Sequence, residues 1–136
     1  MNLKILKQIE LIGKSHNLDF VILHGSKVTR KTINPQSDTD IAVYRNGGID
    51  FEEELSLTGE FIQIFGDSVD VKTLNKKNPL FLYEVIRDGK LLYGNRDAYN
   101  NFVIYIQKKY IDTNQLRFAM RGILQKKQKI LNTLYA

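Results

Sequence analysis

Two aspartates at the start of an apolar run are the residues of this sequence with the clearest chemical potential. Asp38 and Asp40 are separated by one residue, and Asp40 opens the run DIAVY, which has the composition of a buried strand. Side chains alternate between the two faces of a strand, so both carboxylates are expected to point the same way, about 6–7 Å apart at the backbone. Two such charges repel each other unless a cation lies between them. Mg²⁺ suits this pattern, because it binds one or two protein carboxylates and completes its shell with substrate phosphates and water.

A third aspartate could complete such a site. Asp70 stands between Val69 and Val71 in a predicted strand, where a lone buried charge would be costly without a partner or a metal ion. Beside the first two carboxylates it could bind a second metal ion, act as the base for an attacking hydroxyl, or do both. Two ions about 3.5–4 Å apart would hold the attacking and leaving oxygens of a phosphoryl or nucleotidyl transfer. An ion pair with Lys72, two residues further on, is the alternative interpretation.

A glycine–serine pair closes the preceding apolar run and could bind phosphate. Gly25 allows close approach of the backbone, and Ser26 adds an N–H group and a hydroxyl as donors. Lys27 and Arg30 could supply cationic donors to a triphosphate. Taken alone, a Gly-Ser pair or an Asp-x-Asp is usually a turn or a cap. The order strand, Gly-Ser, polar loop, Asp-x-Asp strand, helix and Asp-bearing strand is much more specific.

The remaining pattern predicts one α/β unit with a helical tail. Apolar periodicity and turn residues indicate a helix over 2–16, strands over 18–25, 40–44, 68–74 and 90–94, a helix capped by Asp50 that runs to about 65, and a short helix over 79–89. The segment 97–135 is helical in pattern, with a predicted break near Asp112 and Thr113. Its apolar stripe either packs on the core or contacts a partner, and it consists of Leu116, Met120, Ile123, Leu124, Ile130 and Leu131. We therefore predict a core over 1–95 and a tail over 96–136 within a single domain.

Composition narrows the function classes. The chain has 136 residues, a net charge of +5 and no cysteine, which excludes disulfides, thiolate metal sites and a cysteine nucleophile. No apolar run approaches the ~20 residues that span a bilayer, and no signal peptide is recognisable, so we expect a cytoplasmic protein without membrane contact. The segment from Arg96 onward carries a net charge of +6. A nucleic-acid polymerase would need a primer-binding domain, which this basic segment does not replace, and this argues against nucleic acid as the partner. His16 is expected to face solvent, while His24 either contacts substrate or is structural.

The site residues resemble the nucleotidyltransferase superfamily typified by DNA polymerase beta. More closely, they resemble its smallest members, the minimal nucleotidyltransferases that are paired with HEPN toxins. The resemblance runs from about Leu18 to Gly94 and implies an α/β (α+β) fold, with a small mixed sheet flanked by helices. It also implies two Mg²⁺ ions as cofactors and ATP as the nucleotide donor.

The resemblance assigns roles residue by residue. It implies nucleotide binding by Gly25, Ser26 and Arg30, and metal binding and catalysis by Asp38, Asp40 and Asp70. In the family an arginine commonly stands three residues after the serine and is followed by glycine. Here Arg30 stands four residues after Ser26 and is followed by Lys31, so the loop is one residue longer.

Three functions remain open at this point. The first is an antitoxin enzyme that transfers AMP from ATP to a hydroxyl, a tyrosine in our prediction, of a HEPN ribonuclease toxin. The second keeps the catalysis and changes the acceptor to a small molecule, as in aminoglycoside nucleotidyltransferases, although the chain has little room for a separate acceptor-binding domain. The third is a non-catalytic antitoxin that neutralises its partner by binding alone. The sequence does not name the acceptor, the nucleotide preference, the number of AMP units transferred or the oligomeric state.

Overall fold

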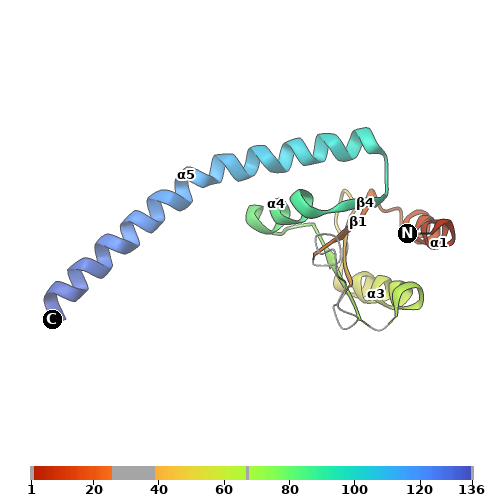
Figure 1. Cartoon of the computed structure of the whole chain (residues 1–136), viewed down its shortest axis with the longest axis horizontal. Helices are drawn as coiled ribbons and strands as arrows, with labels where there is room; N and C mark the ends of the chain where they lie inside the picture. The colour runs from red at the N-terminus through yellow and green to blue at the C-terminus, as the bar shows by residue number, and fades with distance from the viewer. Residues whose placement is uncertain (1, 26–38, 67, 136) are drawn as a thin grey trace.

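A four-stranded mixed sheet forms the centre of the molecule in the computed structural model, which describes residues 2–25, 39–66 and 68–135 (Figure 1). The strands are β1 (Phe20–His24), β2 (Thr39–Tyr44), β3 (Val69–Thr73) and β4 (Lys90–Tyr93). Their order is β3-β2-β1-β4, with β1 antiparallel to β2 and β4, and β2 parallel to β3. The predicted mixed sheet is confirmed.

The described residues form four helices around the sheet, and an asparagine or aspartate immediately precedes each of them. They are α1 (Leu3–Ser15), α3 (Phe51–Phe65), α4 (Pro79–Asp88) and α5 (Arg96–Tyr135). Just before each first turn, one side chain accepts a hydrogen bond from a backbone N–H three residues further on; these residues are Asn2, Asp50, Asn78 and Asn95. Such caps satisfy N–H groups that have no partner within the helix, which explains why the helices begin where they do. The predicted cap at Asp50 is confirmed.

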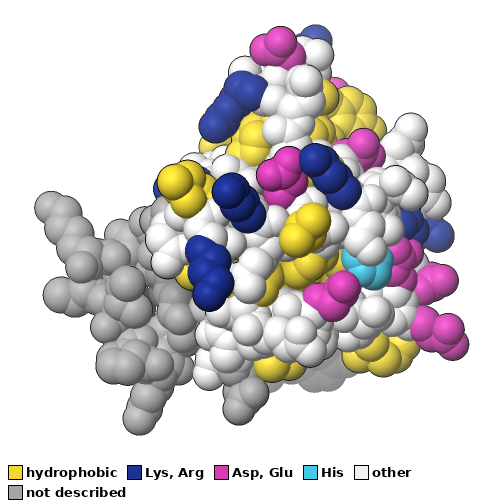
Figure 2. Space-filling model, turned by 90° about the vertical axis from the view of Figure 1, so that its right-hand side faces the viewer, with side chains coloured by type: hydrophobic (Ala, Val, Ile, Leu, Met, Phe, Trp, Pro, Cys, Tyr) yellow, Lys and Arg dark blue, Asp and Glu magenta, His cyan; other side chains and the backbone are white. Residues whose placement is uncertain are grey.

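An ionic network joins the end of α1 to α3. Figure 2 shows acidic, basic and histidine side chains interspersed on one face of the molecule. The prediction that His16 faces solvent is wrong, because only 15% of its side chain is exposed. Its Nδ1 lies 3.0 Å from Glu53 Oε2, and its Nε2 contacts Glu60. Glu53 also accepts hydrogen bonds from Arg45, whose guanidinium donates in addition to the carbonyl oxygens of His16 and Gly48.

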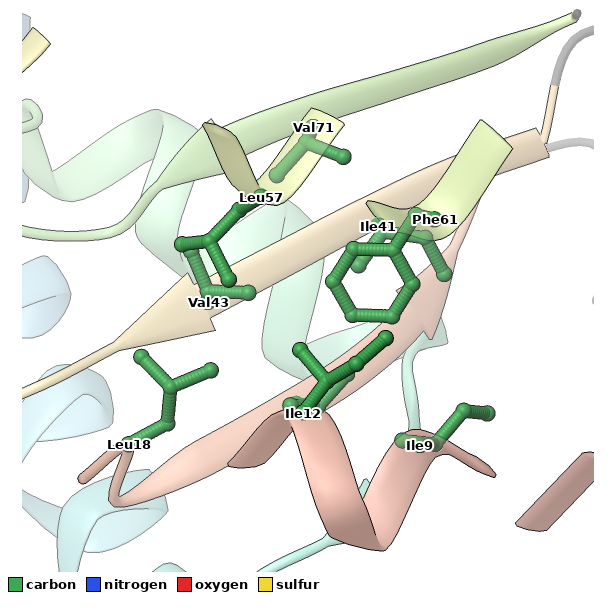
Figure 3. Packing of buried hydrophobic residues seen from close by; sticks show 9 residues of the cluster. Ile9, Ile12, Leu18, Ile41, Val43, Leu57, Phe61 and Val71 are labelled. Carbon is green, nitrogen blue, oxygen red and sulfur yellow. The ribbon is translucent and has the colours of Figure 1, made fainter. Parts of the chain in front are cut away.

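Each face of the sheet packs against its own pair of helices. One face meets α1 and α3 in a buried cluster that includes Ile9, Ile12, Val21, Ile41, Val43, Leu57, Phe61 and Val71 (Figure 3). The other face meets α4 and the first turns of α5, and its cluster includes Phe20, Ile22, Ala42, Leu82, Val85, Ile86, Tyr99 and Ile106. Consecutive residues of β1 and β2 enter opposite clusters, as the alternation of side chains in a strand requires.

The C-terminal helix is continuous, so the predicted break near Asp112 and Thr113 is wrong. The Thr113 hydroxyl donates back to the carbonyl oxygens of Lys109 and Tyr110 and does not cap a new helix. Arg117 donates to Thr113 Oγ1 at 2.6 Å and to the Tyr110 carbonyl oxygen. A threonine whose hydroxyl is satisfied within its own helix no longer competes with the helical backbone.

The first part of α5 is anchored, and its later part projects away from the rest of the molecule (Figure 1). Tyr99 and Ile106 are buried, and Tyr110 stacks on Tyr83 of α4 with ring centroids 4.0 Å apart. The residues of the predicted stripe beyond that point are about half exposed or more: Met120, Ile123, Leu124, Ile130 and Leu131. The side chain of Leu116 lies outside the described residues. No helix in the described part of the chain is long and apolar enough to cross a membrane.

Candidate active site

The strand pairing places three predicted or suspected site residues in one row. The end of β1 meets the start of β2, with His24 opposite Asp40, and β2 runs beside β3 with Asp40 opposite Asp70. Residues opposite each other in a sheet share a face, and neighbouring strands lie about 4.8 Å apart. The two carboxylates therefore start adjacent parallel strands on one face of the sheet. This is the face that α4 and α5 cover.

Gly25 packs directly against the carboxylate of Asp40. Its φ is +84°, and a Cβ atom built on it would lie only 2.2 Å from Asp40 Oδ2. A side chain at this position would be strained by the backbone and would also displace the carboxylate. From the sequence we expected a glycine here because it lets a phosphate come close to the backbone. The structure shows a second reason, which is that the Asp40 carboxylate packs against the Gly25 backbone.

Asp70 is more exposed than the sequence suggested. Its place between two valines in a strand suggested a buried carboxylate that needs a partner or a metal ion, but 48% of its side chain is exposed. Lys72 Nζ lies 3.5 Å from Asp70 Oδ2 and is equally exposed. The alternative interpretation, an ion pair with Lys72, is therefore realised. It does not exclude metal binding, because a half-exposed carboxylate at the rim of a site remains accessible.

His24 completes the row as a neutral side chain. Its Nε2 is buried and has no hydrogen-bond partner among the residues that the structure describes. Burial lowers the pKa of the His24 imidazole, and the opposing charge of Asp40 does not reverse that effect. The ring of Phe81, in the first turn of α4, meets His24 edge-on at a centroid distance of 6.3 Å. His24 thus supplies a neutral nitrogen beside two carboxylates.

Two of the described carboxylates have the chemistry of Mg²⁺ ligands. Asp40 and Asp70 provide oxygen ligands of the kind that Mg²⁺ prefers, on adjacent strands and beside a backbone that fits closely around one of them. Within 2–25, 39–66 and 68–135, no group of three or more histidine, aspartate or glutamate side chains could hold a metal ion. Three predicted site residues lie outside the described residues: Ser26, Arg30 and Asp38. The chemistry of the two described carboxylates fits Mg²⁺.

Three neighbours of this site, His24, Lys72 and Phe81, had no definite role in the prediction from sequence. His24 follows the alternation of β1, so its face could have been derived from the strand pattern. Lys72 is two residues from Asp70 and was recognised only as an alternative partner. Phe81 comes from a different element, and only the packing of α4 on the sheet brings it beside His24 and Lys72.

A mixed sheet with carboxylates at the starts of two adjacent strands has the chemistry of metal-dependent phosphoryl or nucleotidyl transfer. The family model described as "Polymerase beta, Nucleotidyltransferase" matches residues 7–98, which is more than half of the chain. The chain belongs to this family of nucleotidyltransferases.

Comparison with individual proteins gives the same fold. A curated relative, protein adenylyltransferase MntA of Aphanizomenon flos-aquae (strain 2012/KM1/D3), is 32% identical over 100 residues, and the match covers 62% of this chain and 63% of that protein. A crystal structure of a toxin–antitoxin with AMP-PNP superimposes with a TM-score of 0.76 at 21% identity, covering 88% of this chain and 98% of the other. A tri-AMPylated Shewanella oneidensis HEPN toxin in complex with MNT antitoxin gives a TM-score of 0.72 at 20% identity, covering 92% and 99%.

Proposed function

We propose that this chain is a magnesium-dependent protein adenylyltransferase and an antitoxin, which transfers AMP from ATP to a tyrosine hydroxyl of a HEPN ribonuclease toxin. The observation that carries the proposal is the pairing of Asp40 with Asp70 at the starts of two parallel strands, with Gly25 packed on Asp40. The name of the curated relative, a protein adenylyltransferase, supports the same reaction. Two similar structures, one with AMP-PNP and one with an AMPylated HEPN toxin, support ATP as donor and a toxin as acceptor.

Each site residue has a defined part in this proposal. Asp40 and Asp70, together with Asp38, would hold two Mg²⁺ ions, which when bound neutralise the carboxylates and polarise the phosphate that is attacked. Ser26 and Arg30 would bind the triphosphate. The acceptor oxygen forms a bond to the α-phosphorus of ATP, pyrophosphate leaves, and the hydroxyl proton passes to a carboxylate, for which Asp70 is accessible.

A protein acceptor fits this chain better than a small molecule. The described residues form a single sheet with its helices, and no separate acceptor-binding domain is found among them. The later part of α5 instead presents large exposed apolar side chains, such as Met120, Ile123 and Leu124, which a protein partner could cover. The five lysine and arginine residues after Asp112, with no acidic residue among them, favour an acidic surface on that partner.

The test is the transfer reaction itself. The chain is incubated with ATP labelled on its α-phosphate, with Mg²⁺ and with the HEPN partner, and label on the partner is measured. Asp40→Asn and Asp70→Asn should each reduce the rate by more than about a hundredfold, since a lost metal ligand removes several kcal/mol of stabilisation from the transition state. Asp112→Asn, which removes an exposed charge from α5, should leave the rate unchanged.

One outcome would contradict the assignment of the site, and another would contradict the enzyme itself. Transfer at the wild-type rate by both asparagine variants would show that the site is assigned wrongly. Neutralisation of the toxin without any gain of mass, equally strong in the variants, would show an antitoxin that acts by binding alone. Label on a small molecule but not on the partner would favour the aminoglycoside-type reaction.

A further inference from the structure

Lys72 lies on the same face of the sheet as the carboxylates of the candidate site. It follows Asp70 by two residues in β3 and is opposite Ala42 of β2, which packs in the cluster under α4. Its ammonium lies 3.5 Å from Asp70 Oδ2 and 5.9 Å from the centroid of the Phe81 ring. The cation is therefore held between a carboxylate and the face of an aromatic ring.

Stability alone does not explain this arrangement. Both partners are 48% exposed, and an ion pair with that exposure contributes little to folding. A cation–π contact near 6 Å at an exposed position adds little more. The larger consequence is local, because a positive charge beside Asp70 offsets the attraction of this carboxylate for any second cation.

We propose that Lys72 is the resident counter-ion of Asp70 and competes with the divalent metal for it. This inference rests on the proposed function, in which Asp70 is a metal ligand. A divalent cation bound at Asp70 would lie close to the ammonium and repel it, so metal binding displaces Lys72 from the carboxylate. Lys72 is in this sense a positioning residue: it neutralises Asp70 in the metal-free protein and weakens metal binding.

The experiment measures metal affinity without the reaction. Mn²⁺ is titrated into the nucleotide-free chain, and free Mn²⁺ is followed by electron paramagnetic resonance. Lys72→Met keeps the stem against Phe81 and removes the charge, so it should bind Mn²⁺ roughly three- to tenfold more tightly than wild type. Lys72→Arg keeps the charge and should bind like wild type. Circular dichroism confirms that each variant is folded.

Two controls separate this effect from a general change in charge. Lys90→Met removes the charge of another exposed lysine, in β4, where Lys90 is opposite Leu23 and so belongs to the other face of the sheet. It should leave Mn²⁺ affinity unchanged. In an Asp70→Asn background, Lys72→Met should no longer increase affinity, because the carboxylate on which the lysine acts is absent.

The outcomes distinguish the inference from the proposed function. Equal Mn²⁺ affinity of wild type and Lys72→Met, together with weaker binding by Asp70→Asn, would overturn the role of Lys72 and leave the metal site intact. The same increase from Lys90→Met would also overturn it, since any lost positive charge would then suffice. No Mn²⁺ binding by either the wild-type chain or Lys72→Met would overturn this inference and would leave the proposed function to be decided by the transfer assay.

Discussion

At the scale of single residues, Gly25 is required at the end of β1 for two independent reasons. Its φ of +84° lies in the left-handed region that disfavours side chains, and its α-carbon faces Asp40 so closely that a Cβ would meet Oδ2. Gly47 offers a natural comparison. It has a φ of +101°, but nothing lies within 4 Å of the position that its Cβ would occupy.

This pair of glycines predicts a graded result. Gly47→Ala should lower the free energy of unfolding by about 1–2 kcal/mol, the cost of a side chain in the left-handed region. Gly25→Ala should cost more and should also reduce AMP transfer, because the new methyl group must push the Asp40 carboxylate aside. Urea unfolding and the labelling assay measure the two effects. Equal costs for both variants, with full activity of Gly25→Ala, would show that the contact with Asp40 is unimportant.

At the scale of elements, α1 and α3 are held together by a network that depends on pH. Burial alone would lower the pKa of His16, but the hydrogen bonds to Glu53 and Glu60 outweigh burial and raise it. Hydrogen bonds from Arg45 and then His16 lower the pKa of Glu53 to about 2. The protonated imidazole is therefore a cation between two carboxylates, with Arg45 as the other positive charge facing it.

The sign of the pH dependence follows from these shifts. Because the folded pKa of His16 is raised, its contribution to stability is fully present below about pH 6.5, the unfolded value, and is lost as the pH rises through the folded pKa. Glu53 contributes above about pH 4.5, and its contribution is lost as the pH falls towards 2. The whole network is thus strongest between these two limits.

Replacing His16 should therefore cost more stability at pH 5.5 than at pH 9. We expect His16→Gln to lower the free energy of unfolding by about 1–3 kcal/mol at pH 5.5, the cost of losing charged hydrogen bonds at a partly buried site. Urea unfolding at both pH values measures the difference. A cost that is the same at pH 5.5 and pH 9 would show that the charge of His16 does not hold α1 to α3.

The elements themselves were largely predictable from local pattern, and their interactions were not. Apolar runs bounded by turn residues predict the strands, and the Asp50 cap predicts the start of α3, because both signals depend on residues nearby in the sequence. The predicted break at Thr113 failed because its hydroxyl found acceptors one turn back in the same helix. The predictions that His16 is exposed and that Asp70 is buried failed for another reason. Both depend on which element packs over the side chain, and periodicity does not contain that information.

In the candidate site, too, the residues were predictable from the sequence and some of their contacts were not. The sequence predicts Asp40, Asp70 and Gly25 as members, and the sheet register brings them together. The ion pair of Asp70 with Lys72 was foreseen as an alternative, whereas Phe81 was missed, because it reaches His24 and Lys72 from α4. Ser26, Arg30 and Asp38 lie outside the described residues and stay predictions.

At the scale of the whole molecule, α5 extends the chain well beyond its sheet (Figure 1). Its anchor is the stack of Tyr83 on Tyr110, and Arg117 lies over the Tyr110 ring at 4.5 Å. Beyond Asp112, the helix carries its apolar stripe and basic residues without acidic ones. Two copies of this segment would repel each other through their like charges, so an acidic partner suits it better than self-association.

If the apolar stripe of α5 is the docking surface, substitutions in the stripe should weaken partner binding without changing metal binding at the candidate site. Ile123→Asp with Leu124→Asp places two negative charges in the apolar stripe, where the native side chains are 54% and 62% exposed, so folding should be unaffected. We expect partner binding, measured by isothermal titration calorimetry, to weaken by at least tenfold, since a tenfold loss is only about 1.4 kcal/mol and an unpaired charge buried in an apolar interface costs more than that. Mn²⁺ binding at the candidate site should not change.

The matched control places the same charge on the opposite side of the helix. Gln125→Asp with Asn132→Asp adds two negative charges about half a helical turn from the stripe, on residues that are exposed. If the stripe is the docking surface, this control variant binds the partner and transfers AMP to it as the wild-type chain does. If both double variants weaken binding equally, the charge of α5 steers the partner without an apolar contact. If neither does, the acceptor docks on the sheet domain, and α5 serves a purpose outside the transfer reaction.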